Sequence, residues 1–122
     1  MRRAVGSRAN RRDRSPRGFE HGYDVTAEVV ADFGVFRDLH RHRMCTLLWQ
    51  RPNPHLGFEI PEDIETIGMA DACRAVEREV RELYDKLSKD LGESLSEYVV
   101  LFGHNIRFMI GMNLREAQHL LV

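Results

Sequence analysis

The stretch that decides the fold reads DFGVFRDLHRHRMCT and runs from Asp32 to Thr46. Its aspartate is a good helix N-cap, and apolar residues then recur at helical spacing, at Phe33, Phe36 and Leu39. The sequence therefore predicts a short helix over residues 33–42. Five basic side chains gather within seven positions at its end, and a cluster of this density needs either acidic partners or an anionic ligand: Arg37, His40, Arg41, His42 and Arg43.

Two interpretations of this cluster stay open. Cations belong in the last turn of a helix, where they meet the negative end of the helix dipole. Alternatively, Arg41 and Arg43 form a clamp for phosphate or carboxylate, because the guanidinium group binds both oxygens of an anion. A second anion site is predicted at Asn113 and Arg115, where a helix N-terminus offers free amides. Two such sites facing each other would fit a nucleotide or dinucleotide.

Strands are predicted on both sides of the cluster. Residues 23–31 alternate between apolar and polar side chains, as a half-buried strand does, and so do residues 106–112. Met44 to Trp49 forms a short apolar run that ends before two prolines, which indicates a strand or extended segment. After the last strand, Asn113 and Glu116 have the spacing of a capping box, which predicts a helix at the end of the chain.

The middle of the chain is predicted to be helical. Pro61 opens one helix, and after a break near Gly68 an apolar stripe from Ala72 to Leu91 predicts a long helix that stops at Gly92. We expect its charged residues, Glu77 and Arg81 among them, to form a solvated face. Ser94 and Glu97 have capping-box spacing before a short helix to residue 102. Strands interleaved with helices indicate a mixed α/β (α+β) fold.

Composition limits the classes of protein. The chain has 122 residues, of which 43% are apolar and 30% charged, as in soluble globular proteins. No run of about 18 apolar residues occurs, so no membrane span is expected. Cys45 and Cys73 have no CxxC spacing, which fits a reducing cytoplasm. We expect no metal site, because neither the cysteines nor the histidines have ligand spacing, and we assign no catalytic nucleophile.

The N-terminus differs from the rest. Residues 1–17 hold seven arginines and one aspartate, a charge of +6, which leaves −7 for the remainder given the total of −1. We interpret residues 1–18 as a basic, disordered arm and residues 19–122 as one domain. A solvated tail is the preferred interpretation, with nucleic-acid binding as the alternative. Because an apolar helical pattern is still running at Val122, the domain is expected to be incomplete at its C-terminus.

Two motifs resemble the flavin-dependent thymidylate synthases. The family signature is Arg-His-Arg, two residues, Ser, four residues, Ser, one residue, Arg, and this chain has Arg41-His42-Arg43-x-x-Thr46. Met112-Asn113-x-Arg115-x-x-x-His119 resembles the late motif of that family. The order of the motifs also agrees, so the resemblance covers residues 20–122.

The resemblance implies a cytoplasmic α/β flavoprotein that assembles as a homotetramer. Such enzymes bind FAD and convert dUMP to dTMP, with methylenetetrahydrofolate and NADPH as co-substrates. Arg41, His42, Arg43, Asn113 and Arg115 would then bind FAD, and Thr46 and Arg51 the substrate.

The chain departs from the family pattern, and the departures keep a second function open. The second Ser of the signature falls on Arg51 and the final Arg on Asn53, at positions that help to hold dUMP in the family. Arg51 replaces the missing arginine only if the loop is two residues shorter. The alternative is a non-catalytic, degenerate unit that acts as an interaction or scaffolding domain.

Overall fold

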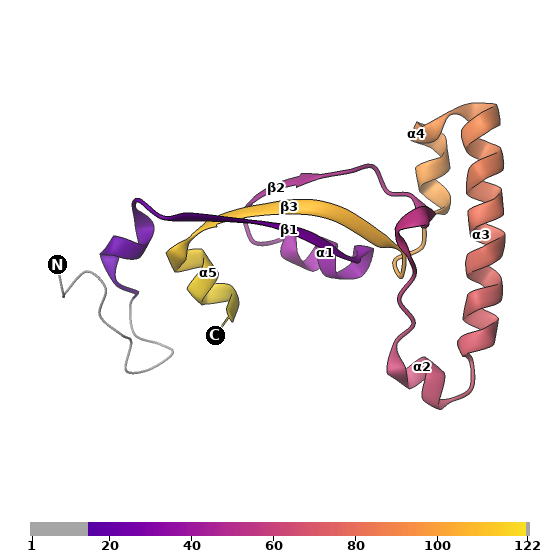
Figure 1. Ribbon diagram of the computed structural model, residues 1–122, viewed down its shortest axis with the longest axis horizontal. Helices are drawn as coiled ribbons and strands as arrows, with labels where there is room; N and C mark the ends of the chain where they lie inside the picture. The colour runs from indigo at the N-terminus through magenta and orange to yellow at the C-terminus, as the bar shows by residue number, and fades with distance from the viewer. Residues whose placement is uncertain (1–14, 122) are drawn as a thin grey trace.

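A three-stranded antiparallel sheet is the centre of the molecule. The computed structural model describes residues 15–121. Strand β3 (Asn105–Asn113) lies in the middle, with β1 (Asp24–Asp32) on one side and β2 (Thr46–Trp49) on the other (Figure 1). All three strands were predicted from alternation or apolar runs, and the mixed α+β fold class is confirmed.

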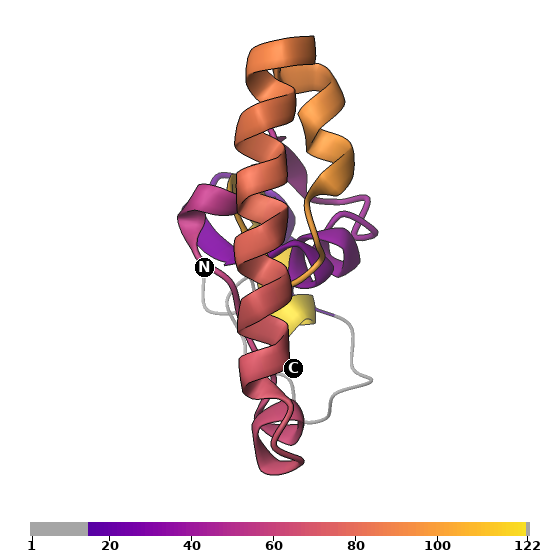
Figure 2. The same cartoon turned by 90° about the vertical axis from the view of Figure 1, so that its right-hand side faces the viewer.

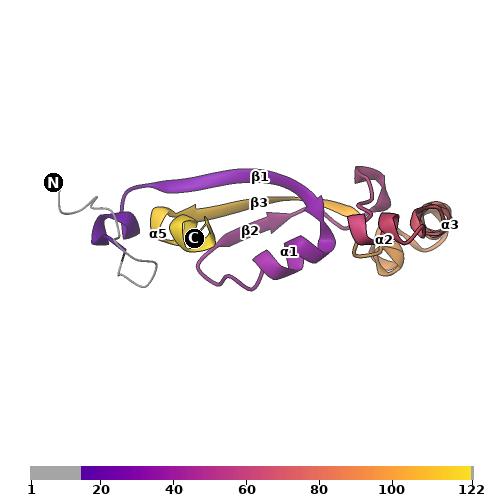
Figure 3. The same ribbon diagram turned by 90° about the horizontal axis from the view of Figure 1, so that it is seen from below.

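The sheet has one covered face and one open face. Ile106, Phe108 and Ile110 of β3 are buried, whereas Arg107 and Met109 between them are exposed. Helices α1 (Phe33–Leu39) and α5 (Leu114–Leu121) both lie on the face that carries the buried residues (Figures 1 and 3). Period-two alternation along β3 therefore separates a packed core from a face that no helix of the described chain covers.

Phe36 is the central residue that α1 contributes to the core. It is 5% exposed and its ring lies 5.1 Å from that of Phe108, measured between centroids. The helix begins as expected, because Asp32 Oδ1 accepts a hydrogen bond from the backbone N–H of Val35 at 3.0 Å. It ends at Leu39 rather than at residue 42, so the basic cluster after His40 belongs to a turn and not to the last helical turn.

The other end of the sheet carries most of the helices. Helix α2 (Glu62–Thr66) leads into α3 (Ala70–Leu91), which ends at Gly92 with a positive φ of 87°, as predicted. Helix α4 (Glu93–Ser96) runs back beside α3 (Figure 2). Three single 3-10 turns complete the described elements: η1 (Arg17–Glu20), η2 (Pro54–Leu56) and η3 (Glu97–Val99).

The prediction for the long helix was right in extent and partly wrong in burial. Val76, Leu83 and Leu91 of the apolar stripe are 50%, 44% and 58% exposed. Tyr84, which belongs to the predicted stripe, is buried as expected, but so is Glu77, which therefore does not belong to a solvated face. The physical reason is that the main contacts of α3 are with α4 and the short turns η2 and η3, which cover a narrow strip of its surface.

The predicted capping box at Ser94 was also wrong. Helix α4 begins at Glu93 after Gly92, and no side chain caps it. Ser94 Oγ instead accepts a hydrogen bond from Arg51 Nη1 at 2.6 Å, and Glu97 pairs with the same nitrogen at 3.1 Å. Both acceptors bind Arg51, which is distant in sequence, because the loop that carries it passes beside α4.

The predicted basic arm falls mostly outside the described residues. Its last four residues are described, and they are attached: Ser15 Oγ donates to Gln118 Oε1 of α5 at 2.8 Å, and Arg17 begins η1. None of the helices in the described range is long and apolar enough to cross a membrane.

Candidate functional site

A hollow of about 510 Å³ lies on the open face of the sheet, at the end nearest α5. All three strands and the turn before β2 contribute to its walls. Gly111 of β3 forms part of the floor, and its register partners Thr26 and Thr46 flank it on the two neighbouring strands. The remaining lining residues are Asp24, Met44, Leu48, Met109, Met112 and Asn113.

Residues from both predicted motifs meet at this hollow. Thr46 from the first motif and Asn113 from the second both line it, although 67 positions separate them in the sequence. They converge because β2 and β3 are antiparallel neighbours, so the start of β2 lies beside the end of β3. Asn113 also caps α5, since its Oδ1 accepts a hydrogen bond from the backbone N–H of Glu116 at 3.0 Å.

The basic cluster forms a tight turn next to the hollow. The backbone N–H groups of Arg41 and His42 donate to carbonyls of α1, and the N–H of Cys45 donates to the His42 carbonyl at 3.0 Å. Arg41 and Arg43 are exposed, and neither has an ion pair with any other residue of the range 15–121. Arg43 directly precedes Met44, which lines the hollow. The turn that carries these two arginines therefore borders the hollow through Met44.

The middle residue of the motif, His42, is directed toward α5. His42 Nδ1 lies 3.3 Å from Oε1 of Glu116, whose side chain is only 10% exposed. The thiol of Cys45 lies 3.9 Å from the same oxygen. Burial, followed by the negative charge of Glu116, raises the pKa of the Cys45 thiol above its ordinary value, so the sulfur stays protonated at neutral pH. The resulting His–Glu–Cys cluster ties the basic turn to α5.

Sequence reasoning missed this role of Glu116. Its position three residues after Asn113 suggested a capping box, but only the Asn113 half of that motif forms. The available signal was that Glu116 lies on the same helical face as Leu120, which packs against the core. A carboxylate on a core-facing stripe indicates a buried partner, and the basic turn was the nearest candidate.

Two other predicted site residues already have partners within the chain. Arg115 pairs with Glu20 of η1. Arg51 is bound to Ser94 and Glu97, beyond the opposite end of β2 from Thr46. Five extended residues span about 16 Å, so the fold does not bring Arg51 to the hollow that Thr46 lines.

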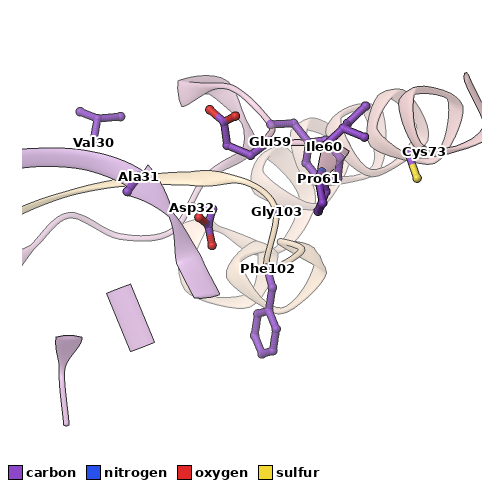
Figure 4. A pocket seen from close by; sticks show the side chains of 10 residues that line it. Val30, Ala31, Asp32, Glu59, Ile60, Pro61, Cys73, Phe102 and Gly103 are labelled. Atoms are coloured by element: carbon purple, nitrogen blue, oxygen red, sulfur yellow. The ribbon is translucent and has the colours of Figure 1, made fainter. Parts of the chain in front are cut away.

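A larger hollow of about 730 Å³ lies near α3, and Figure 4 shows its lining. It contains no predicted site residue. Its two carboxylates are engaged within the chain, because Asp32 caps α1 and Glu59 accepts a hydrogen bond from Asn105 Nδ2 at 3.3 Å. Most of the remaining wall is apolar and comes from Val30, Ala31, Ile60, Pro61 and Phe102. The smaller hollow, whose wall includes Met44 from the turn that carries Arg41 and Arg43, is the better candidate for a site that binds anions.

The possible metal ligands of residues 15–121 do not cluster as a metal site requires. No group of three or more His, Cys, Asp or Glu side chains has the arrangement of a metal site there. The cluster around Glu116 consists of one imidazole, one carboxylate and one thiol.

Comparison with known proteins supports the fold more than the activity. No protein-family model matches the chain. It is 34% identical over 118 residues to a UPF0159 protein of Chlamydia pneumoniae, and 34% identical over 117 residues to one of Chlamydia muridarum. These matches include 94% and 96% of this chain but 21% and 22% of the relatives, so the chain spans about a fifth of their length.

The fold has a close structural counterpart. The UMP/dUMP methylase PolB from Streptomyces cacaoi, solved with 5-Br UMP, superimposes with a TM-score of 0.73 at 17% sequence identity. The superposition covers 86% of this chain and 57% of the methylase chain. The chain therefore shares its mixed α+β fold with that methylase over most of its length.

Proposed function

We propose that this chain is a pyrimidine-nucleotide-binding unit of the flavin-dependent thymidylate synthase type, acting on dUMP or UMP. The observation that carries the proposal is the convergence at one hollow of Thr46, Asn113 and Met44, the residue that directly follows Arg43, in a fold like that of a UMP/dUMP methylase. Neither the fold nor the motif pattern would be sufficient alone, because one fold serves many functions.

The chemistry of the hollow suits a mononucleotide. Its volume lies within the range of small-molecule sites, roughly 300–1,000 Å³. Met44, Leu48 and Met109 are exposed apolar side chains around it, and methionine sulfur packs well against flat heteroaromatic rings. Arg41 and Arg43 would bind the phosphate, since arginine is suited to bidentate contact with phosphate oxygens. The hydroxyl of Thr46 would donate to or accept from the base or sugar.

FAD is the proposed cofactor. The residues present fit its phosphates and its flavin ring, but they do not provide contacts along the whole molecule. When FAD and not the nucleotide occupies the hollow, Arg41 and Arg43, which pair with no residue of the range 15–121, would neutralise the pyrophosphate, and the methionines would contact the ring. When bound, FAD would supply hydride transfer, with NADPH and methylenetetrahydrofolate as the co-substrates. Because the hollow opens on an uncovered sheet face, a second subunit would have to provide the opposite wall, which agrees with the proposed homo-oligomer.

A second candidate function is a non-catalytic unit that keeps the fold. Arg51, which would have to hold the substrate, is bound to α4, and Arg115 is paired with Glu20. This candidate predicts a folded chain that binds neither FAD nor dUMP.

Gly111 allows a direct test of the proposed site, because its lack of a side chain leaves the floor of the hollow open. A Cβ at this position would lie 3.7 Å from Thr26 Oγ1 and 3.8 Å from Thr46 Cβ, which is ordinary contact. Valine is also favoured in strands. Gly111→Val should therefore fold and fill the hollow.

The experiment is a titration of the chain with FAD and, separately, with dUMP. The proposal expects saturable binding that Gly111→Val abolishes and that Arg41→Ala together with Arg43→Ala weakens. Arg78→Ala, an exposed arginine of α3, is the matched control and should bind like the wild type. Absence of binding by a folded wild-type chain would favour the non-catalytic unit.

A further inference from the structure

Glu116 is a buried carboxylate that the proposed binding chemistry does not use. It is 8% exposed and lies on α5, next to the candidate site. A buried ion pair contributes little net stability, because the cost of removing both charges from water offsets their attraction. A purely apolar residue on this stripe would stabilise the fold as well, so the carboxylate calls for another explanation.

Its contacts connect the two halves of the site. Oε1 lies 3.3 Å from His42 Nδ1 and 3.9 Å from Cys45 Sγ, which are two points on the basic turn. Its own backbone N–H is bound by the side chain of Asn113, which lines the hollow. One residue therefore fixes the turn after α1 to the end of β3.

We propose that Glu116 is a positioning residue and that it acts through His42, so that only Arg41 and Arg43 of the basic motif contact the anionic ligand. This inference rests on the proposed function for the identity of the ligand. His42 is directed inward at Glu116, and its ring centroid lies 6.0 Å from that of His119 on the same helix. With the middle residue held to α5 and the N–H of Cys45 closing the turn, the two arginines on either side project into solvent.

The groups that face Glu116 are few. His42 and Cys45 come from the turn, and no lysine or arginine of residues 15–121 lies within ion-pair distance of its carboxylate. His42 is then the side chain of the turn that can pair with the carboxylate, and loss of either partner frees the other. This arrangement predicts strong coupling between substitutions at positions 42 and 116.

A double-mutant cycle tests the coupling, with FAD and dUMP as the probes. Glu116→Gln and His42→Ala should each lower the affinity by about three- to tenfold, and the double variant should be no weaker than the weaker single variant. Fold-changes that multiply in the double variant would overturn the proposal, since they would mean that His42 contacts the ligand independently. Glu79→Gln and His21→Ala, at exposed positions, are the matched controls.

A second cycle separates positioning from general stability. If Glu116 acts through the arginines, Glu116→Gln should cause no further loss of affinity in a chain that already carries Arg41→Ala and Arg43→Ala. A further loss of the full three- to tenfold would contradict the proposal.

Amide hydrogen exchange gives a readout that needs no ligand. Exchange at residues 41–45 should become faster in Glu116→Gln and in His42→Ala, and should stay unchanged in Glu79→Gln. If the wild-type chain binds neither probe, the proposed function fails while this readout still decides the inference. Unchanged exchange in both variants would overturn it. His42 is one-third exposed, so His42→Ala carries the test if Glu116→Gln does not fold.

Discussion

The two ends of β3 each place a histidine against a buried glutamate, but the pairs differ in their surroundings. Before the strand begins, His104 is fully buried and its Nε2 lies 3.9 Å from Glu77. After the strand ends, His42 is 34% exposed and its Nδ1 lies 3.3 Å from Glu116. Glu77 has a second partner in Arg81, whereas no arginine of the described chain pairs with Glu116.

The difference shows how the same pair of residues serves two purposes. Burial lowers the pKa of His104, so its imidazole is neutral at neutral pH, and Nδ1 accepts a hydrogen bond from the N–H of Leu101 at 3.0 Å. His104 is thus a packing residue, and Arg81 supplies the charge that Glu77 needs. At the other end His42 is the residue that joins Glu116 to the turn that carries Arg41 and Arg43.

Removal of each histidine side chain should show the largest difference between the two pairs, measured as the loss in the free energy of unfolding. His104→Ala leaves a cavity beside Phe58 and an unsatisfied N–H on Leu101, so we expect a loss of about 2–4 kcal/mol in the free energy of unfolding. His42→Ala, at a partly exposed pair, should cost less than about 1 kcal/mol. Urea unfolding measures both, and equal losses would contradict the comparison.

The free energy of unfolding should fall in acid because of His104. Its pKa in the folded chain is lowered from the ordinary value of 6.5, so the unfolded chain binds the proton more readily. The stability that the neutral, buried imidazole contributes is fully present above pH 6.5. It is lost as the pH falls below that value, because unfolding then takes up at most one proton at this histidine. Unfolding free energies at pH 7, 6 and 5 should show this decline in the wild type.

The control for this prediction is His104→Leu, a side chain that cannot take up a proton. Its stability should depend less on pH between 7 and 5. A decline as steep as that of the wild type would assign the acid sensitivity to other groups.

Removal of helix caps should also distinguish the two ends of β3, with smaller losses of stability. Asn113→Ala and Asp32→Ala each remove a side-chain cap, of α5 and α1 respectively, and each should cost about 1 kcal/mol. Only Asn113→Ala should also weaken dUMP binding, because Asn113 lines the hollow on the open face. Thermal unfolding and dUMP titration of the same two samples would check this. Weaker binding in Asp32→Ala would place the ligand at the larger hollow instead.

The smallest effect is expected at Arg51. Its contacts with Ser94 and Glu97 are exposed, so Arg51→Ala should cost less than about 0.5 kcal/mol. The affinity for dUMP should not change, since Arg51 lies far from Thr46. A clear loss of affinity would restore Arg51 as the substrate residue that the motif alignment suggested.

Local sequence patterns predicted the elements well where a single cause determines them. Alternation in β3 gave both the strand and its buried face, and Asp32 and Asn113 capped their helices as expected. The helix over α1 was also predicted, although it ends at Leu39 and not at residue 42. These features depend on neighbours in sequence, so the sequence alone contains them.

The failures involve contacts between distant residues. Ser94 and Glu97 satisfied a capping pattern but bind Arg51, 43 and 46 positions away. Glu77 fitted a solvated charge pattern but lies under His104. Glu116 fitted a capping box but pairs with His42. In each case the polar side chain has a distant partner that only the packing of the chain reveals, and Glu77 keeps its predicted local partner Arg81 as well.

The most direct test of the central claim is a dUMP titration followed by amide chemical shifts in ¹⁵N-labelled chain. The account predicts that the largest shifts occur at Thr46, Gly111 and Asn113 and that Gly111→Val abolishes them. Shifts concentrated at Phe58 and Gly103 of the larger hollow, or no shifts at saturating dUMP, would contradict the claim that the two motifs form one nucleotide site.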